Sequence, residues 1–121
     1  MERKILDKLK KWKDSSDRKP LILQGARQIG KTWIVNTFAS KEYSNCVYLN
    51  FEKDKTLESF FSELNPEEIV RKLSGYYRRE IIKGQTLVIF DEVQACPSAI
   101  TSLKYFCEEA NDYHIIALGS L

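Results

Sequence analysis

The residues whose types and spacing point most directly to chemistry are eight in a row, Gly-Ala-Arg-Gln-Ile-Gly-Lys-Thr at positions 25–32. They fit the pattern G-x-x-x-x-G-K-[ST], in which the glycines let the main chain approach phosphate groups closely. Successive backbone N–H groups of such a loop bind phosphate oxygens, and the N-terminus of the following helix adds positive potential. We therefore predict a nucleotide-phosphate site formed by Gly25, Ala26, Arg27, Gln28, Ile29, Gly30, Lys31, Thr32 and Trp33.

We make a separate prediction for each of three side chains of this loop. Lys31 supplies positive charge to the β- and γ-phosphates, and the Thr32 hydroxyl is a ligand for Mg²⁺. Arg27 touches the nucleotide or a neighbouring subunit, or else faces solvent. The alternative is an incidental glycine turn that contains a lysine. The apolar run before the loop and the helical pattern after it favour the phosphate site.

A pair of carboxylates, Asp91 and Glu92, follows an apolar run at residues 86–90. Ligands of open α/β sheets bind at the carboxyl ends of the strands. We predict that Asp91 holds Mg²⁺ through water and that Glu92 orients and polarises the attacking water. Such a pair alone is also typical of a solvated strand end. The Lys-Thr motif, with Thr32 lying 59 residues before Asp91, makes the functional interpretation the stronger one.

A hydroxyl follows the last apolar run, where Gly119 and Ser120 come after residues 115–118. At a strand end Ser120 could reach the γ-phosphate or the attacking water. It could equally be an ordinary turn residue, and the residues leave both interpretations open. The predicted catalytic residues are therefore Glu92, Lys31 and Ser120.

The elements that must position these residues follow from the apolar pattern. Short apolar runs, typical of buried parallel strands, alternate with helical periodicity. This alternation predicts an α/β fold with a parallel sheet flanked by helices. The expected strands are residues 21–23, 46–51, 86–90 and 115–118. The expected helices are residues 4–14, 31–40, 57–64, 66–83 and 97–110.

Two of these helices carry further signals. Asn65, Pro66 and Glu68 predict a capped start, with a capping box, for a helix that ends near Gly84. Basic and aromatic residues on that helix suit a nucleic-acid surface, but a packed tyrosine pair with solvated cations is the favoured interpretation. Residues 1–19 are predicted as an amphipathic helix that packs on a core formed by residues 20–121.

Length and composition set the outer bounds. The 121 residues suit one domain, and 43% apolar with 12% aromatic residues indicate a packed core. A net charge of +2 makes no strong case for a nucleic-acid or membrane partner, and no apolar run reaches 18 residues. Three cysteines without paired spacing predict reduced thiols and a cytoplasmic location: Cys46, Cys96 and Cys107.

These motifs carry a family resemblance. The strings GARQIGKT, VYLNFEKD, TLVIFDEVQACPSAITSLKYFCE and YHIIALGSL resemble the N-terminal ATPase core of a family of prokaryotic AAA-type ATPases. The resemblance implies a P-loop NTPase with strand order 5-1-4-3-2, of which strand five is missing here, so we expect a truncated core. It assigns nucleotide binding to Gly25, Gly30, Lys31 and Thr32. It assigns the metal, catalytic-acid and sensor positions to Asp91, Glu92 and Ser120.

The function implied by the resemblance is Mg²⁺-dependent hydrolysis of the β–γ bond of ATP, coupled to an unknown target, a protein or DNA. The alternative is a nucleotide-binding switch with little hydrolysis, because the later parts of the family are missing. The sequence leaves the oligomeric state open: a homo-oligomer is one alternative, since AAA-type relatives often complete the site with a neighbour's arginine. No membrane partner is expected. A GTPase is disfavoured because no N-K-x-D sequence occurs, and a small-molecule kinase because no arginine-rich lid is evident.

Overall fold

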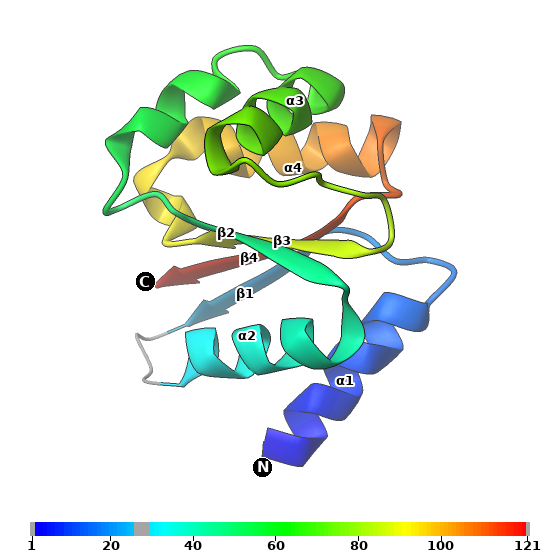
Figure 1. The fold of residues 1–121 in the computed structure, drawn as a ribbon. Coiled ribbons are helices and arrows are strands. Elements are labelled where there is room, and N and C mark those ends of the chain that lie inside the picture. Colours follow the sequence, from blue (N-terminus) through cyan, green and yellow to red (C-terminus); the bar gives the residue numbers. More distant parts are fainter. Residues whose placement is uncertain (1, 26–29, 121) are drawn as a thin grey trace.

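One parallel sheet forms the centre of the molecule in the computed structural model, which describes residues 2–25 and 30–120 (Figure 1). Its spatial order is β1-β4-β3-β2, and every neighbouring pair is parallel. The α/β class and the order 1-4-3-2 agree with the sequence prediction. The strands are β1 (Leu21–Gly25), β2 (Asn45–Asn50), β3 (Thr86–Asp91) and β4 (His114–Ser120).

Helices cover both faces of the sheet, which explains why its strands are apolar nearly throughout. Figure 1 shows one pair of helices above the sheet and another below it. The upper pair is α3 (Pro66–Tyr77) and α4 (Pro97–Glu109), and the lower pair is α1 (Glu2–Asp14) and α2 (Lys31–Glu42). Two short 3₁₀ helices complete the described elements, η1 (Lys55–Phe61) and η2 (Val93–Ala95).

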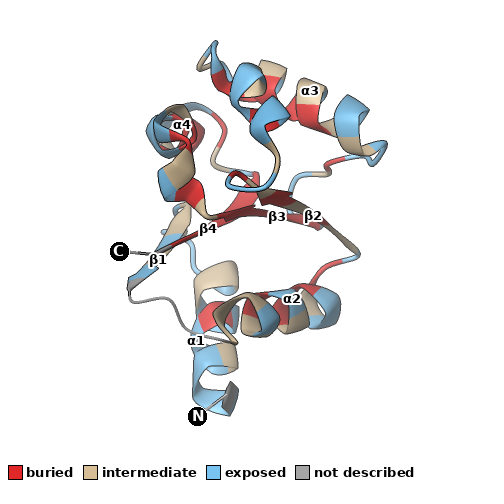
Figure 2. Ribbon diagram, turned by 90° about the vertical axis from the view of Figure 1, so that its left-hand side faces the viewer, coloured by how far each residue is buried: buried red, intermediate tan, exposed pale blue. Residues whose placement is uncertain are grey.

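The two faces of the sheet each build a core, because alternate residues of a strand point to opposite sides. On β3, Val88 and Phe90 join the core under α3 and α4, whereas Leu87 and Ile89 join the core over α1 and α2. All six residues of β3 are buried, and in Figure 2 β3 and β4 are the most continuously buried strands, whereas β1 is partly exposed. The strand that ends in the predicted acidic pair is therefore rigidly held.

The N-terminal helix is tied to the rest of the molecule by Trp12. Its ring packs against Phe38 of α2 and against His114 of β4, with ring centroids 6.5 and 5.9 Å apart. Its Nε1 donates to the main-chain oxygen of Lys19 at 2.6 Å, which fixes the segment that leads into β1. Leu9 is buried on the same helix. Helix α1 thus packs on α2.

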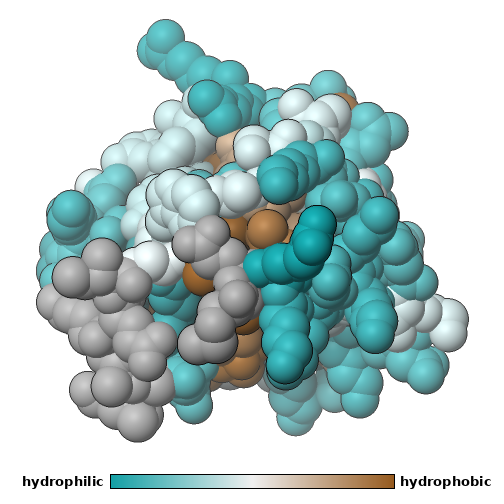
Figure 3. All heavy atoms as spheres, turned by 90° about the horizontal axis from the view of Figure 1, so that it is seen from below, coloured by the Kyte–Doolittle hydropathy of each residue, from teal (hydrophilic) through white to brown (hydrophobic). Residues whose placement is uncertain are grey.

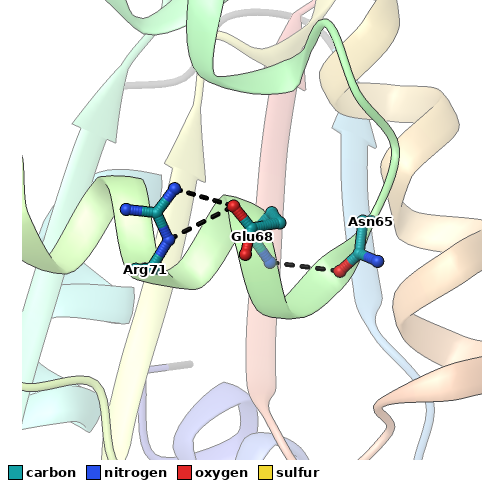
Figure 4. Close-up of polar contacts among 3 residues, drawn as sticks. All are labelled: Asn65, Glu68 and Arg71. Carbon is teal, nitrogen blue, oxygen red and sulfur yellow. Dashed lines mark hydrogen bonds and ion pairs between the residues drawn. The ribbon is translucent and has the colours of Figure 1, made fainter.

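Helix α3 begins as predicted but ends earlier than predicted. Asn65 Oδ1 accepts from the main-chain N–H of Glu68 at 3.1 Å, so the predicted cap is confirmed. The Glu68 carboxylate accepts two hydrogen bonds from Arg71, as Figure 4 shows, and does not return to Asn65 in a capping box. The helix stops at Tyr77, where Arg78 adopts a left-handed conformation with φ of 55°.

The early end of α3 has a visible cause. Two bonds join Ser74 to Arg79 beyond the helix end: its main-chain oxygen accepts from the N–H of Arg79 at 3.1 Å, and its hydroxyl donates to the oxygen of Arg79 at 2.5 Å. The chain then turns back toward β3, and Ile81 is still buried from this loop. Gly84, with φ of 76°, lies in the turn before β3 and does not end the helix. Of the residues predicted as a helix at 57–64, residues 57–61 lie in the 3₁₀ helix η1 and residues 62–64 are not helical.

Candidate functional site

The predicted site residues gather at one edge of the sheet because all four strands run in the same direction. The carboxyl end of β1 at Gly25 is paired with that of β4 at Ser120, and Asn50 of β2 is paired with Asp91 of β3. Residues far apart in the sequence are therefore brought to the same edge. This is the edge at which open α/β sheets bind their ligands.

Thr32 and Asp91, the two predicted metal ligands, are in direct contact. Thr32 Oγ1 donates to Asp91 Oδ2 at 3.1 Å, and Asp91 is only 7% exposed. Thr32 reaches this position because α2 begins at Lys31, directly after Gly30. Gly30 has φ of 107°, a conformation that side-chain-bearing residues rarely adopt, so this turn into the helix requires glycine.

Lys31 crosses from the start of α2 to the end of β4. Its Nζ donates to the main-chain oxygen of Gly119 at 3.4 Å. Gly119 itself packs closely against the segment after β3, because a Cβ atom placed there would lie 3.3 Å from Gln94 Oε1. The lysine, β4 and the segment after the acidic pair therefore meet in one small region.

Asp91 accepts hydrogen bonds on both of its carboxylate oxygens. Besides Thr32, the hydroxyl of Tyr48 donates to Oδ2, and the main-chain N–H of Glu92 donates to Oδ1 at 2.8 Å. Asn50 Nδ2 donates in turn to the Tyr48 hydroxyl at 3.4 Å. Burial, together with the bond to Asp91, raises the pKa of Tyr48 to about 12, so the hydroxyl keeps its proton at neutral pH.

Sequence reasoning missed Tyr48 and Asn50. Both lie on β2, two positions apart and hence on the same face of the strand, beside Ile89 and Asp91 of β3. The available signal was a polar pair in an otherwise apolar run, next in the sheet to the strand that carries the acids. Its value depends on knowing that β2 and β3 are neighbours.

Glu92 has an unusual backbone. Its φ of 53° and ψ of 46° lie in the left-handed region, which costs a residue with a Cβ atom about 1–2 kcal/mol. The conformation is held by the following turn, in which the N–H of Ala95 donates to the Glu92 oxygen at 3.1 Å. Its carboxylate accepts from Gln94 Nε2 at 2.8 Å. The side chain is thus held immediately after Asp91 by a strained but well-bonded turn.

The structure gives less information about the other predicted site residues. Ala26, Arg27, Gln28 and Ile29 lie outside the described residues, and of Ser120 only the strand position, opposite Gly25, is described. Trp33 follows Thr32 on α2 and is 56% exposed. Its ring is not part of either core cluster.

A pocket of about 330 Å³ adjoins Gly30 and Lys31 on the side of α1. Figure 3 views the face that carries α1 and α2 and shows apolar atoms in a hollow bordered by hydrophilic side chains. The pocket brings together α1, the end of β1 and the start of α2, and half of its lining is aliphatic. The lining residues are Ile5, Lys8, Leu23, Gln24, Gly30, Lys31, Ile34 and Val35.

None of the helices in the described part of the chain is both long and apolar enough to cross a membrane. No group of three or more His, Cys, Asp or Glu side chains within residues 2–25 and 30–120 is arranged to hold a metal ion. The Thr32 hydroxyl and the Asp91 carboxylate, which are in contact, are the two groups that the sequence predicts as ligands of the metal.

Comparison with known proteins now adds to this geometry. Residues 17–121 match the AAA domain family. The chain belongs to this family. AAA domains generally bind ATP with Mg²⁺, so nucleotide binding is implied for the chain at the level of the family. No curated protein sequence is significantly similar to it.

The structure of PCH-2 from C. elegans shares the fold of this AAA domain. The TM-score is 0.56, over 99% of this chain and 37% of that one, with 15% sequence identity. A likeness at this identity shows the fold alone, that of a P-loop NTPase. This AAA domain spans about 37% of the length of PCH-2.

Proposed function

We propose that this AAA domain binds ATP and Mg²⁺ at the carboxyl edge of its sheet and hydrolyses the β–γ bond. The observation that carries the proposal is the contact of Thr32 Oγ1 with Asp91 Oδ2 at the first turn of α2, with Lys31 beside it. Gly30 at the end of the proposed phosphate loop, the N-terminus of α2 and the acidic end of β3 then lie together.

Lys31 and the start of α2 would bind the phosphates. The lysine now donates to a main-chain oxygen of Gly119, a weak partner at 3.4 Å that phosphate oxygens would replace. A charge-assisted bond to an anion is roughly twice as strong as a neutral one. The first N–H groups of α2 have no partner within the helix and add to the same anion site.

Thr32 and Asp91 fit Mg²⁺ by their chemistry, since this cation takes hard oxygen ligands and keeps much of its water. The Thr32 hydroxyl donates a hydrogen bond to Asp91, which leaves the lone pairs of its oxygen for a cation. Asp91 would then accept from water on the metal. The bound ion would neutralise the charge that develops on the phosphate oxygens.

Glu92 is proposed as the group that orients the attacking water. It follows Asp91 directly, its carboxylate accepts from Gln94, and its backbone is strained in the way often found at functional sites. A carboxylate held beside the phosphates can accept a proton from water as the bond to phosphorus forms. The apolar pocket beside Gly30 and Lys31 is the proposed place for the base of the nucleotide.

The test is ATP binding by titration calorimetry, with and without Mg²⁺, in the wild type and in Lys31→Ala. We expect loss of the lysine to weaken binding at least tenfold, about 1.4 kcal/mol. Lys41→Ala is the matched control, because Lys41 is an exposed lysine at the other end of the same helix. Equal ATP affinity in the wild type and Lys31→Ala would contradict the proposed site.

A further inference from the structure

We propose that Tyr48 is a positioning residue for the metal site: its hydroxyl holds the Asp91 carboxylate in the orientation that Mg²⁺ binding requires. The inference rests on the proposed function, because it concerns the metal ligand named there. It adds a residue of β2 to a site otherwise built from α2 and β3. Neither the phosphate-loop pattern nor the acidic pair includes this residue.

The bonds on the Asp91 carboxylate show why it needs holding. A carboxylate has about four acceptor sites, and its plane turns freely unless both oxygens are bonded. Oδ1 is held by the N–H of Glu92, and Oδ2 is held by the hydroxyls of Thr32 and Tyr48. The described residues thereby use three sites, and we expect the fourth to accept from water on a metal ion.

Tyr48 differs from Thr32 in what it can do once a cation is present. Thr32 is itself a proposed ligand, so its hydroxyl is shared between the metal and Asp91. Tyr48 lies on the strand next to β3, opposite Ile89, and its position is set by the strand register. It can therefore keep its bond to Asp91 while Thr32 turns its oxygen to the ion. Outer-shell groups of this kind orient metal ligands in many proteins.

The Tyr48 hydroxyl is itself fixed by the turn after β2. Asn50 Oδ1 accepts from the main-chain N–H groups of Glu52 and Lys53, at 3.1 and 3.0 Å. These two bonds hold the amide, whose Nδ2 donates to the Tyr48 hydroxyl at 3.4 Å. The tyrosine oxygen accepts this hydrogen bond, and the hydroxyl donates its own hydrogen bond to Asp91. A directed chain thus runs from the turn to the proposed metal site.

The competing explanation is that the hydroxyl bonds to Asp91 only to satisfy its own partial burial. In that case its loss would change the stability of the fold and leave metal binding unaltered. The two explanations therefore predict different responses to the same substitution. The discriminating quantity is the Mg²⁺ concentration needed for nucleotide binding, compared with ATP affinity without metal.

The experiment is Tyr48→Phe, which removes one oxygen and keeps the ring. We expect the Mg²⁺ concentration for half-maximal ATP binding to rise about 10- to 100-fold, the usual cost of losing an outer-shell group. ATP affinity without metal should stay unchanged. Tyr113→Phe is the matched control, because the Tyr113 hydroxyl also donates to a carboxylate, that of Glu67 at 2.9 Å, away from the site. Thermal unfolding of both variants checks that they are folded.

A double-mutant cycle with Asp91→Asn tests whether Tyr48 acts through Asp91. In that background Tyr48→Phe should weaken Mg²⁺ binding no further, since interacting residues are not additive. An unchanged Mg²⁺ requirement in folded Tyr48→Phe would overturn the inference and leave the proposed function standing. Absence of any Mg²⁺-dependent ATP binding in the wild type would overturn the proposed function and, with it, this inference.

Discussion

The two ends of the sheet both carry a tyrosine hydroxyl bonded to a titratable group, but the surroundings of the two hydroxyls differ. At the carboxyl end Tyr48 donates to Asp91. At the amino end the Tyr43 hydroxyl and His114 Nδ1 are hydrogen bonded at 2.6 Å. The surroundings of these two pairs, and not the pairs themselves, are the reason that we propose a ligand site at only one end.

The amino end is closed by the chain itself. Arg18 donates to the main-chain oxygen of Asn111 at 2.7 Å, and Asn111 Nδ2 donates back to the oxygen of Arg18. The rings of Trp12 and Tyr43 pack edge-on against His114. Tyr43 thus bonds to His114 and Arg18 bonds to Asn111 at this end, whereas the polar groups of the carboxyl end converge on a lysine and a helix N-terminus. A buried polar cluster therefore indicates a ligand site only when it faces groups that can bind a ligand, such as a lysine and a helix N-terminus.

The largest effect is expected from Glu92→Gln at the carboxyl end. If Glu92 orients the attacking water, the variant should bind ATP and hydrolyse it at least 100-fold more slowly, the usual range for losing a general base. Steady-state phosphate release, alongside ATP titration, measures both. Glu108→Gln, at an exposed glutamate of α4, is the control. Wild-type binding without measurable hydrolysis would favour the nucleotide-binding switch, and unchanged hydrolysis in the variant would remove Glu92 from the mechanism.

The amino end should dominate the response of stability to acid. Burial, with help from the nearby cations Arg18 and Lys13, lowers the pKa of His114 from 6.5 to about 4. The unfolded chain therefore binds more protons between these values, so the contribution is complete above pH 6.5 and is lost as pH falls through about 4. We expect it to be on the order of 2 kcal/mol.

Chemical denaturation at several pH values measures this contribution. In His114→Gln the free energy of unfolding should fall less steeply between pH 6.5 and 4 than in the wild type. Carboxylates that titrate in the same range affect both proteins and cancel in the difference. Parallel curves for the two proteins would show that His114 is not the source of the acid sensitivity.

Short sequence patterns were enough to predict the features that residues close together in the sequence form with one another. The glycine, lysine and threonine of the loop were predicted from their spacing along the chain, and the cap at Asn65 uses residues three apart. The strand order also agreed with expectation, although that order came from the family resemblance and not from periodicity. Short-range chemistry and a known fold class together placed Thr32 beside Asp91.

The sequence predictions were wrong or incomplete where one sequence pattern is compatible with two different local structures. Tyr77 and Ile81 are spaced as on a helix, but a loop that bends at Arg78 delivers Ile81 to the same core. The bond from Tyr48 to Asp91 joins residues 43 apart and depends on strand register, which no local pattern reveals. In both cases the missing information was three-dimensional.

A smaller effect comes from Tyr43→Phe, the amino-end counterpart of Tyr48→Phe. Loss of this hydroxyl leaves His114 Nδ1 without its hydrogen bond to Tyr43, and the free energy of unfolding should fall by about 1 kcal/mol. Mg²⁺-dependent ATP binding should be unchanged. Thermal unfolding should therefore show a loss of stability in Tyr43→Phe, and the Mg²⁺ titration should show a raised Mg²⁺ requirement in Tyr48→Phe only. A metal-binding defect in Tyr43→Phe would break the distinction between the two ends.

The smallest effect concerns the pocket beside the proposed phosphate site. Ile34→Ala removes part of its aliphatic lining, and ATP affinity should fall about three- to fivefold, near 1 kcal/mol. Affinity for inorganic triphosphate should not change, because that ligand has no base to fill the pocket. Ile100→Ala on α4, where Ile100 is 40% exposed, provides the matched control. Equal losses of affinity for ATP and triphosphate would mean that the base binds elsewhere and that Ile34 affects only the start of α2. A loss of affinity for ATP alone would extend the proposed site at the carboxyl end of the sheet to the surface of α1.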